Sequence, residues 1–172
     1  MNLQSTDFEL FNLPVKFEQN ADLIDARWKQ LQREAHPDKF AAQGPSAQRV
    51  AMQWSVRINE AYTRLKEPLK RATYLCKLNE VSVNAESNTA MPAGFLAQQL
   101  EWREALEDAH TAQALEEIAQ NAVDAREHQL SLLKQLLDLK KDFAEAARQI
   151  RSLMFIERFS SEVNARIDQL GQ

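Results

Sequence analysis

The sequence of 172 residues has only one cysteine, three glycines and five prolines. The single cysteine, Cys76, cannot form a disulfide within the chain, and it cannot build a zinc site that needs several cysteines. The scarcity of glycine and proline, beside abundant Ala, Leu, Glu and Gln, argues against a β-sandwich or barrel. We therefore predict an all-α protein in which Cys76 is a small apolar residue on a helix.

The sequence also lacks long apolar runs. Its start, Met1-Asn2-Leu3-Gln4, has no basic stretch followed by an apolar one, and no later stretch is long and apolar enough to cross a membrane. We expect a soluble, cytoplasmic protein without a membrane partner.

The net charge of −4 is unevenly distributed along the chain. Residues 1–77 hold 12 Lys and Arg against 9 Asp and Glu, which gives +3, whereas residues 78–172 hold 9 against 16, which gives −7. This asymmetry predicts two modules with different electrostatic surfaces. Neither is basic enough to indicate a nucleic acid as the main ligand.

The first module shows the signals of a helical hairpin. Thr6-Asp7-Phe8-Glu9 fits a capping box at the start of a short helix, after which Phe8, Phe11 and Leu13 should fold inward near Pro14. We expect a second helix from about Asn20 to Ala35, a loop of about ten residues through Ser46, and a third helix from Pro45 to Lys66. Pro68 should end the third helix and open a shorter fourth one.

Apolar residues recur at helical spacing in both long helices. At roughly 100° per residue, Lys29 and Arg33 fall opposite the apolar stripe of the second helix and should be exposed together. Pro37 disfavours the α conformation at His36, which predicts that the second helix stops there. The stripe of the second helix consists of Ile24, Trp28, Leu31 and Ala35, and that of the third of Val50, Trp54, Ile58, Ala61 and Leu65.

Polar residues, Pro and Gly gather between Asn79 and Gly94 with little periodicity. We therefore divide the chain into a first module of residues 1–78, a connector of residues 79–92 and a second module of residues 93–172. Beyond the connector we expect helices over about 93–108, 111–137 and 139–170. Their apolar stripes suit an antiparallel three-helix bundle.

His36 is the first candidate for catalysis, because histidine titrates near neutrality. One hypothesis is an all-helical acid/base catalyst that uses His36 and Asp38, which would require a concave pocket around the hairpin tip. His110 and His128 lie in the other module, and no histidine has a neighbouring cysteine, so we expect neither a metal site nor a cofactor. There is no glycine-rich phosphate loop and no recognisable nucleophile, so we predict no catalytic residues.

His36-Pro37-Asp38 lies at the predicted tip of the hairpin, between the Lys29/Arg33 pair and Lys39-Phe40. In this context residues 6 to about 76 resemble a J-domain. The resemblance implies a module through which co-chaperones stimulate ATP hydrolysis by DnaK-type chaperones. It also implies that the chaperone is bound by Lys29, Arg33, His36, Pro37, Asp38 and Lys39.

Further motifs extend the likeness over nearly the whole chain. They are Ser55-Val56-Arg57-Ile58-Asn59-Glu60-Ala61-Tyr62, Leu65-Lys66-Glu67-Pro68, Arg71-Ala72-Thr73-Tyr74-Leu75 and Phe95-Leu96-Ala97-Gln98-Gln99-Leu100-Glu101-Trp102-Arg103-Glu104. With them the sequence resembles the HscB family of iron–sulfur cluster assembly. The resemblance implies two partners, the chaperone HscA and the scaffold protein IscU. It also implies that the chain is not an enzyme itself and stimulates the ATPase activity of the chaperone. A general J-protein that serves unfolded clients is the alternative binding hypothesis.

The helix predicted over 93–108 has two apolar faces. Phe95, Trp102 and Leu106 lie within about 40° of each other and form a core face, whereas Leu96 and Leu100 form a second stripe that carboxylates border. Two interpretations are open: a helix buried on two sides, or a patch that binds a partner.

The family resemblance favours the partner patch, because this helix binds the scaffold in HscB proteins. Ala97 departs from the family pattern, in which methionine is familiar, and this could weaken the grip on the scaffold. The residues that the resemblance assigns to scaffold binding are Leu96, Ala97, Leu100, Glu101, Glu104 and Phe155.

Overall fold

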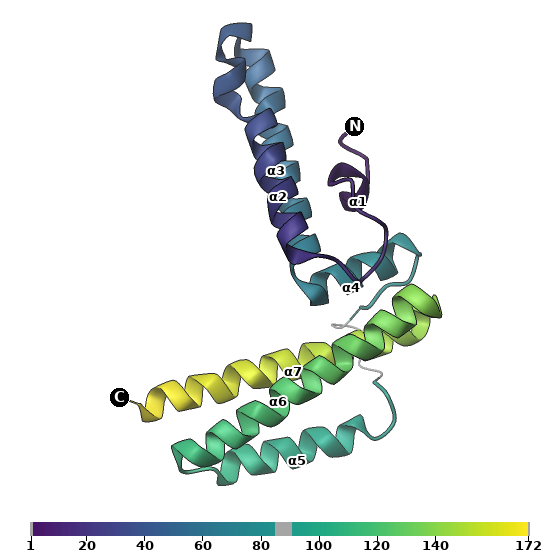
Figure 1. Ribbon diagram of the computed structural model, residues 1–172. Coiled ribbons are helices and arrows are strands. Elements are labelled where there is room, and N and C mark those ends of the chain that lie inside the picture. Colours follow the sequence, from purple (N-terminus) through teal and green to yellow (C-terminus); the bar gives the residue numbers. More distant parts are fainter. Residues whose placement is uncertain (1, 85–90, 172) are drawn as a thin grey trace. The chain divides into compact units, whose positions relative to one another are not determined.

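The computed structural model describes residues 2–84 and 91–171. Throughout these residues the secondary structure is helical, without strands, which confirms the all-α prediction. The elements are α1 Asp7–Leu10, α2 Ala21–Ala35, η1 Pro37–Gln43, α3 Pro45–Lys66, α4 Pro68–Leu78, α5 Phe95–Asp108, α6 Ala112–Lys134, η2 Gln135–Leu139 and α7 Phe143–Leu170 (Figure 1).

The chain separates into two compact units, Met1–Leu75 and Cys76–Gln172. The predicted connector, residues 79–92, includes residues 85–90, which lie outside the described part of the chain. No helix among the described residues is long and apolar enough to span a membrane.

The first unit begins with the short helix α1, which is capped as predicted: the Thr6 hydroxyl accepts a hydrogen bond from the Glu9 amide at 3.1 Å. Phe8, Phe11 and Leu13 are buried, which confirms that this segment folds inward. Through this segment α1 packs against α3.

A buried carboxylate fastens α1 to the other helices. Asp7 is fully buried, and its two oxygens accept hydrogen bonds from the guanidinium groups of Arg57, at 2.8 Å, and Arg64, at 2.6 Å. Two cations two turns apart on α3 therefore hold one anion, and the Asp7 amide donates to the Tyr74 hydroxyl on α4. Hydrogen bonds to Asp7 raise the pKa of Arg64 above its ordinary value.

The hairpin consists of α2 and α3, which pack side by side (Figure 1). Asn20 caps α2 by accepting hydrogen bonds from two amides of its first turn, and Pro68 opens α4, both as predicted. Ile24 and Leu31 are buried on the predicted stripe of α2. On α3 the stripe holds for Ile58, Ala61 and Leu65 but is wrong for Val50, which is 51% exposed and lines an open pocket.

The segment between α2 and α3 is more regular than the predicted loop. Residues Pro37–Gln43 form the 3₁₀ helix η1, and Gly44 with φ of 98° then turns the chain into α3. A positive φ of this kind costs a glycine little. The loop prediction failed because Pro37 can open a helical turn as well as end the preceding helix.

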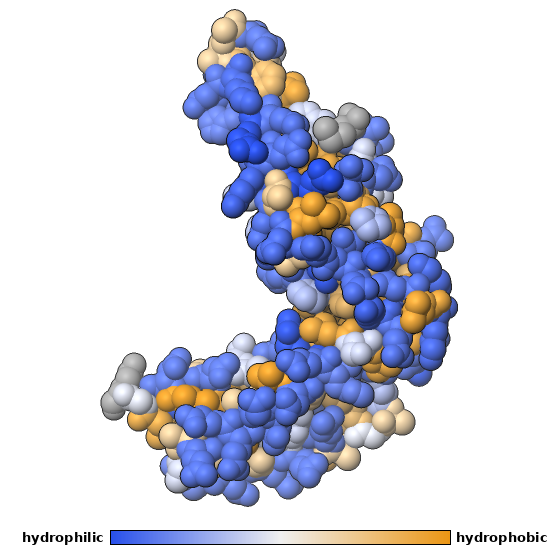
Figure 2. All heavy atoms as spheres, viewed as in Figure 1, coloured by the Kyte–Doolittle hydropathy of each residue, from blue (hydrophilic) through white to orange (hydrophobic). Residues whose placement is uncertain are grey.

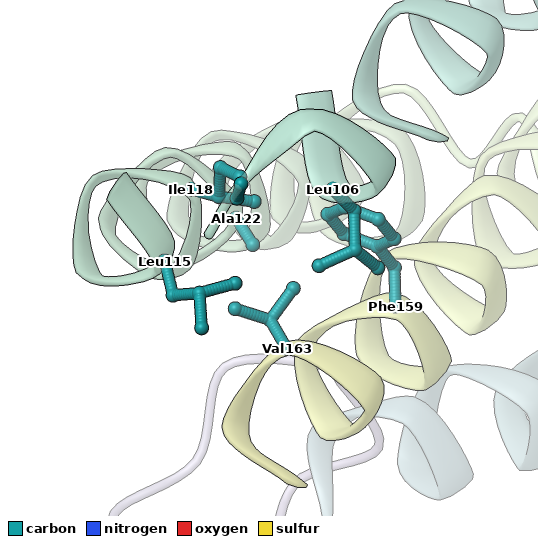
Figure 3. Packing of buried hydrophobic residues seen from close by; sticks show 7 residues of the cluster. Leu106, Leu115, Ile118, Ala122, Phe159 and Val163 are labelled. Atoms are coloured by element: carbon teal, nitrogen blue, oxygen red, sulfur yellow. The ribbon is translucent and has the colours of Figure 1, made fainter. Parts of the chain in front are cut away.

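The second unit contains α5, α6 and α7 with an apolar core between them. Side chains from all three helices point toward one another, as Figure 3 shows for six of them. The buried cluster comprises Leu106, Ala109, Leu115, Ile118, Ala122, Phe159 and Val163. This packing agrees with the predicted three-helix bundle.

Two helix bounds in this unit differ from the prediction. The α-helix α6 ends at Lys134 and continues as the π-helical turn η2, and α7 begins at Phe143 and not near residue 139. Lys141 has φ of 54°, and the Asp142 carboxylate then accepts a hydrogen bond from the Glu145 amide at 3.1 Å. This cap fixes the start of α7. The prediction placed the start near residue 139 because it relied on apolar periodicity alone, which does not reveal the turn.

Candidate functional site

His36 lies between α2 and η1, as the C-cap residue of the first and the N-cap residue of the second. Its backbone is extended, with φ of −63° and ψ of 129°, as the following proline predicts. The imidazole Nδ1 accepts a hydrogen bond from the Asp38 amide at 3.2 Å, so the ring caps η1. The Asp38 carboxylate lies 3.6 Å from the same nitrogen. The tripeptide therefore forms a compact turn whose shape depends on the imidazole.

The polar groups of this tip face water. The side chains of His36 and Asp38 are 58% and 91% exposed. Lys29, Arg33 and Lys39 are exposed too, which confirms that the Lys29/Arg33 pair lies on the outer face of α2. None of these three cations has a carboxylate within 4 Å in the described part of the chain.

Such exposure argues against the acid/base hypothesis for His36 and Asp38. A catalytic acid/base pair acts on a substrate held in a concave pocket, whereas these two side chains are open to solvent. The arrangement suits recognition by another protein, since charges without partners can pair with charges on a docking surface.

Side-chain bonds between α2 and α3 hold the hairpin behind the tip. The Asn59 carboxamide oxygen accepts hydrogen bonds from the Trp28 indole, at 2.9 Å, and the Gln32 amide, at 2.7 Å. Farther from the tip, Asp25 accepts from the Tyr62 hydroxyl at 2.7 Å and from Lys66 Nζ at 2.7 Å. The hydrogen bond from Lys66, with that from Tyr62, lowers the pKa of Asp25 below its usual value.

In the second unit, α5 divides its residues between two faces. Phe95 and Leu106 are buried, and the half-buried Trp102 stacks on Phe159 of α7 with ring centroids 5.1 Å apart. The predicted core face is therefore confirmed.

The opposite face of α5 is uncovered. Leu96 and Leu100 are 68% and 58% exposed, and Ala97, Glu101 and Glu104 are exposed beside them. Among the residues the structure describes, neither glutamate forms an ion pair. The sequence left two interpretations open for this helix. Burial of α5 on both sides is wrong within this unit, and its outer face is an apolar strip bordered by carboxylates that form no ion pair among the described residues.

Phe155 of α7 lies beneath α5 and is half-buried. Its ring packs edge-on against Phe95, with centroids 5.7 Å apart, and near Trp102, at 6.4 Å. The Arg103 guanidinium stands over it at 5.6 Å and pairs with Glu162. A role of Phe155 in scaffold binding stays a prediction. In the structure its ring supports α5 through the contacts with Phe95 and Trp102.

Sequence reasoning missed the two arginines that fix α5. Besides the Arg103–Glu162 pair, Arg166 of α7 donates to the carbonyl oxygens of Leu106, at 3.1 Å, and Ala109, at 2.9 Å, at the end of α5. These partners are 57 to 60 residues apart, so no local spacing signals them. The exposed strip is thus held on a fixed helix.

No group of three or more His, Cys, Asp or Glu side chains that could hold a metal ion occurs in the described ranges 2–84 and 91–171. Cys76 is buried, and burial raises the pKa of its thiol to about 11, which keeps it protonated and unreactive at neutral pH.

Comparison with known proteins identifies relatives over the whole chain. The model of the "HSCB C-terminal oligomerisation domain" matches residues 91–164. Proteins named "Co-chaperone protein HscB homolog" from Burkholderia multivorans and Burkholderia thailandensis are 47% identical over 173 residues, covering 99% of this chain and 98% of each relative.

Two solved structures share the fold. The chaperone HscB from Vibrio cholerae matches with a TM-score of 0.85 and 35% identity over 96% of this chain and 99% of that one. The human co-chaperone protein HscB matches with a TM-score of 0.86 over 99% of this chain and 84% of that one, and its 24% identity makes it a likeness of fold alone.

Proposed function

The chain belongs to the HscB family of co-chaperones, and we propose that it binds the iron–sulfur scaffold protein IscU, delivers it to the DnaK-type chaperone HscA and stimulates the ATPase of that chaperone. The proposal includes a cytoplasmic location, which the resemblance to the family implies. ATP hydrolysis belongs to the chaperone, so this chain acts without catalytic residues or a cofactor of its own.

The observation that carries the proposal is the exposed turn at His36. Pro37 and the imidazole hold the turn, and Asp38 pairs with an arginine of the chaperone. Lys29, Arg33 and Lys39 then attract an acidic surface and speed the encounter. A loop fixed before binding loses little conformational entropy on docking, which supports its use as a recognition element.

The scaffold binds to the outer strip of α5 in this proposal. Leu96 and Leu100 contribute apolar area, with Ala97 between them and Phe155 below. Glu101 and Glu104 set the orientation of a partner that carries basic groups. Both partners are then held by one chain, so their encounter becomes nearly intramolecular.

One experiment tests the whole proposal. The ATPase rate of the chaperone is measured with this protein alone, with the scaffold alone and with both together. We expect the rate with both to exceed the sum of the separate increases, because the chain presents the scaffold to the chaperone. A merely additive rate contradicts the delivery role.

Two other uses of the second unit can be tested. The matching family model is described as an oligomerisation domain, which favours contact between two copies, and a general J-protein would bind unfolded clients there. Sedimentation of the protein alone tests the first use. Competition between folded scaffold and an unstructured peptide for the second unit tests the other.

A further inference from the structure

The hydrogen bond that caps η1 depends on the protonation state of His36. Nδ1 of the imidazole accepts this bond from the Asp38 amide at 3.2 Å. An imidazole nitrogen accepts only through its lone pair, so the bond requires a neutral ring whose single proton is on Nε2. The turn at the hairpin tip therefore has this form only while His36 is uncharged.

The ring is open to protons from water. The side chain of His36 is 58% exposed, and hydrophilic residues prevail on the visible face of the α2–α3 hairpin (Figure 2). Histidine is the side chain that ordinarily changes its charge between about pH 5 and 8. Protonation of the ring thus needs no opening of the structure.

One carboxylate is placed to pair with a charged ring. Among the described residues, Asp38 supplies the only carboxylate within 4 Å of a ring nitrogen, with Oδ2 at 3.6 Å from Nδ1. The Glu34 carboxylate instead accepts a hydrogen bond from the Gln30 amide at 3.2 Å. The charged side chains in the turns next to His36 are Arg33 and Glu34 on α2, Asp38 and Lys39 on η1 and Arg49 on the first turns of α3, which pack against η1.

From this geometry we propose that His36 is a pH-sensitive switch: the neutral ring holds the turn in the form that engages the chaperone, and the protonated ring releases it. A proton from water adds to the Nδ1 lone pair, so Nδ1 no longer accepts from the Asp38 amide and donates to Asp38 Oδ2 instead. The cap of η1 is lost, and Asp38 is drawn away from the arginine of the chaperone. The inference rests on the proposed function and assigns to the same turn a regulation by pH.

Nuclear magnetic resonance on the ¹⁵N-labelled protein tests the switch without any partner. At about pH 8 the nitrogen shifts of His36 should show a bare Nδ1 and a protonated Nε2. As the pH falls to about 5.5, the Asp38 amide proton should move upfield with the same midpoint as the ring. A proton on Nδ1 at the higher pH, or an Asp38 amide that does not follow the ring, overturns the inference.

His36→Asn is the matched control for this titration. Asparagine is a strong N-cap residue, and its side-chain oxygen accepts a hydrogen bond at every pH in this range. The Asp38 amide of the variant should therefore stay nearly constant. A pH-dependent shift as large as that of wild type would mean that the ring is not its cause.

The ATPase assay shows whether the switch governs stimulation. The protein is titrated into a fixed amount of chaperone and ATP at about pH 7.8 and about pH 5.8, and each rate is divided by that of the chaperone alone at the same pH. The concentration for half-maximal stimulation should rise by roughly threefold to tenfold at the lower pH, because most rings are then charged.

Two controls accompany the assay. Stimulation by the scaffold alone does not involve His36 and corrects for effects of pH on the chaperone itself. His110→Gln removes an exposed histidine of the second unit and should show the same rise as wild type.

The outcomes separate this inference from the function on which it rests. If the protein stimulates at neither pH, the proposed function fails, whatever the ring does. If the half-maximal concentration is the same at both pH values, the function is upheld and the switch is overturned. If His110→Gln abolishes the pH dependence, another histidine is responsible and the inference is wrong.

Discussion

The hairpin tip and the outer face of α5 are both exposed, yet they are built differently. The tip presents a histidine, a carboxylate and cations on a turn fixed by backbone geometry and one imidazole bond. The face of α5 presents two leucines on a regular helix, anchored from below by aromatic rings and two arginines. Polar recognition needs a defined turn, whereas apolar recognition needs area on a rigid support.

This difference predicts different consequences of substitution. At the tip, one side chain decides whether the turn has the right shape, so a single change should remove function. On α5, area is shared among several residues, so a single change should weaken binding by degrees.

The largest effect should come from His36→Gln. Glutamine should not reproduce the hydrogen bond that the His36 imidazole accepts from the Asp38 amide, so stimulation of the chaperone's ATPase should be abolished while the helical circular dichroism stays unchanged. His110→Gln, at an exposed histidine of the second unit, is the control and should stimulate normally. Retained stimulation by His36→Gln would refute the role of the turn.

Asp7→Asn should have the next largest effect, on stability. Removing the charge of a fully buried carboxylate leaves Arg57 and Arg64 without their anion, which should lower the free energy of unfolding of the first unit by about 3 to 5 kcal/mol. Urea denaturation followed by circular dichroism measures the loss. The exposed Glu9→Gln on the same helix is the control, and an equal loss there would show that the buried pairing is not responsible.

Replacing Leu96 and Leu100 together with alanine should weaken scaffold binding by about 2 to 3 kcal/mol, through lost apolar contact area, and leave basal stimulation of the chaperone intact. Titration calorimetry with the scaffold gives the affinity. Leu139→Ala is the control in the same unit, since Leu139 is 76% exposed on η2. An unaltered affinity in the double variant would remove the α5 strip from the interface.

The smallest effect should come from Asp25. Its pKa is lowered by the hydrogen bond from Lys66, so the contribution of its charge to stability is present above the ordinary value of 3.8 and is lost as the pH falls through the lower folded value. Asp25→Asn should therefore flatten the acid side of the stability profile and leave stimulation unchanged. Thermal denaturation between about pH 2 and pH 7 measures this slope. A profile parallel to that of wild type would mean that the pair with Lys66 is too solvated to matter.

Much of the fold follows from local sequence. The caps at Thr6 and Asn20, the stop at His36, the start at Pro68 and the two faces of α5 were all predictable from spacing and from the conformational limits of proline. These features depend on residues within a few positions of each other, where the geometry of one helix decides the outcome.

The side-chain bonds between residues far apart in the sequence could not be predicted. The Asp7 network joins residues 50 and 57 positions apart, and the clamps by Arg103 and Arg166 join α5 to α7 over similar separations. Val50 satisfied the helical period yet stayed exposed, because the period identifies a face and not the element that covers it.

The sequence by itself determined which residues share a face of each helix and which tripeptide interrupts the hairpin, because periodicity and proline chemistry act locally. Only the tertiary structure decided that the imidazole of His36 caps the following turn and that the leucines of α5 stay uncovered within their unit. Exposure is a property of what packs nearby, and packing partners are chosen across the whole chain.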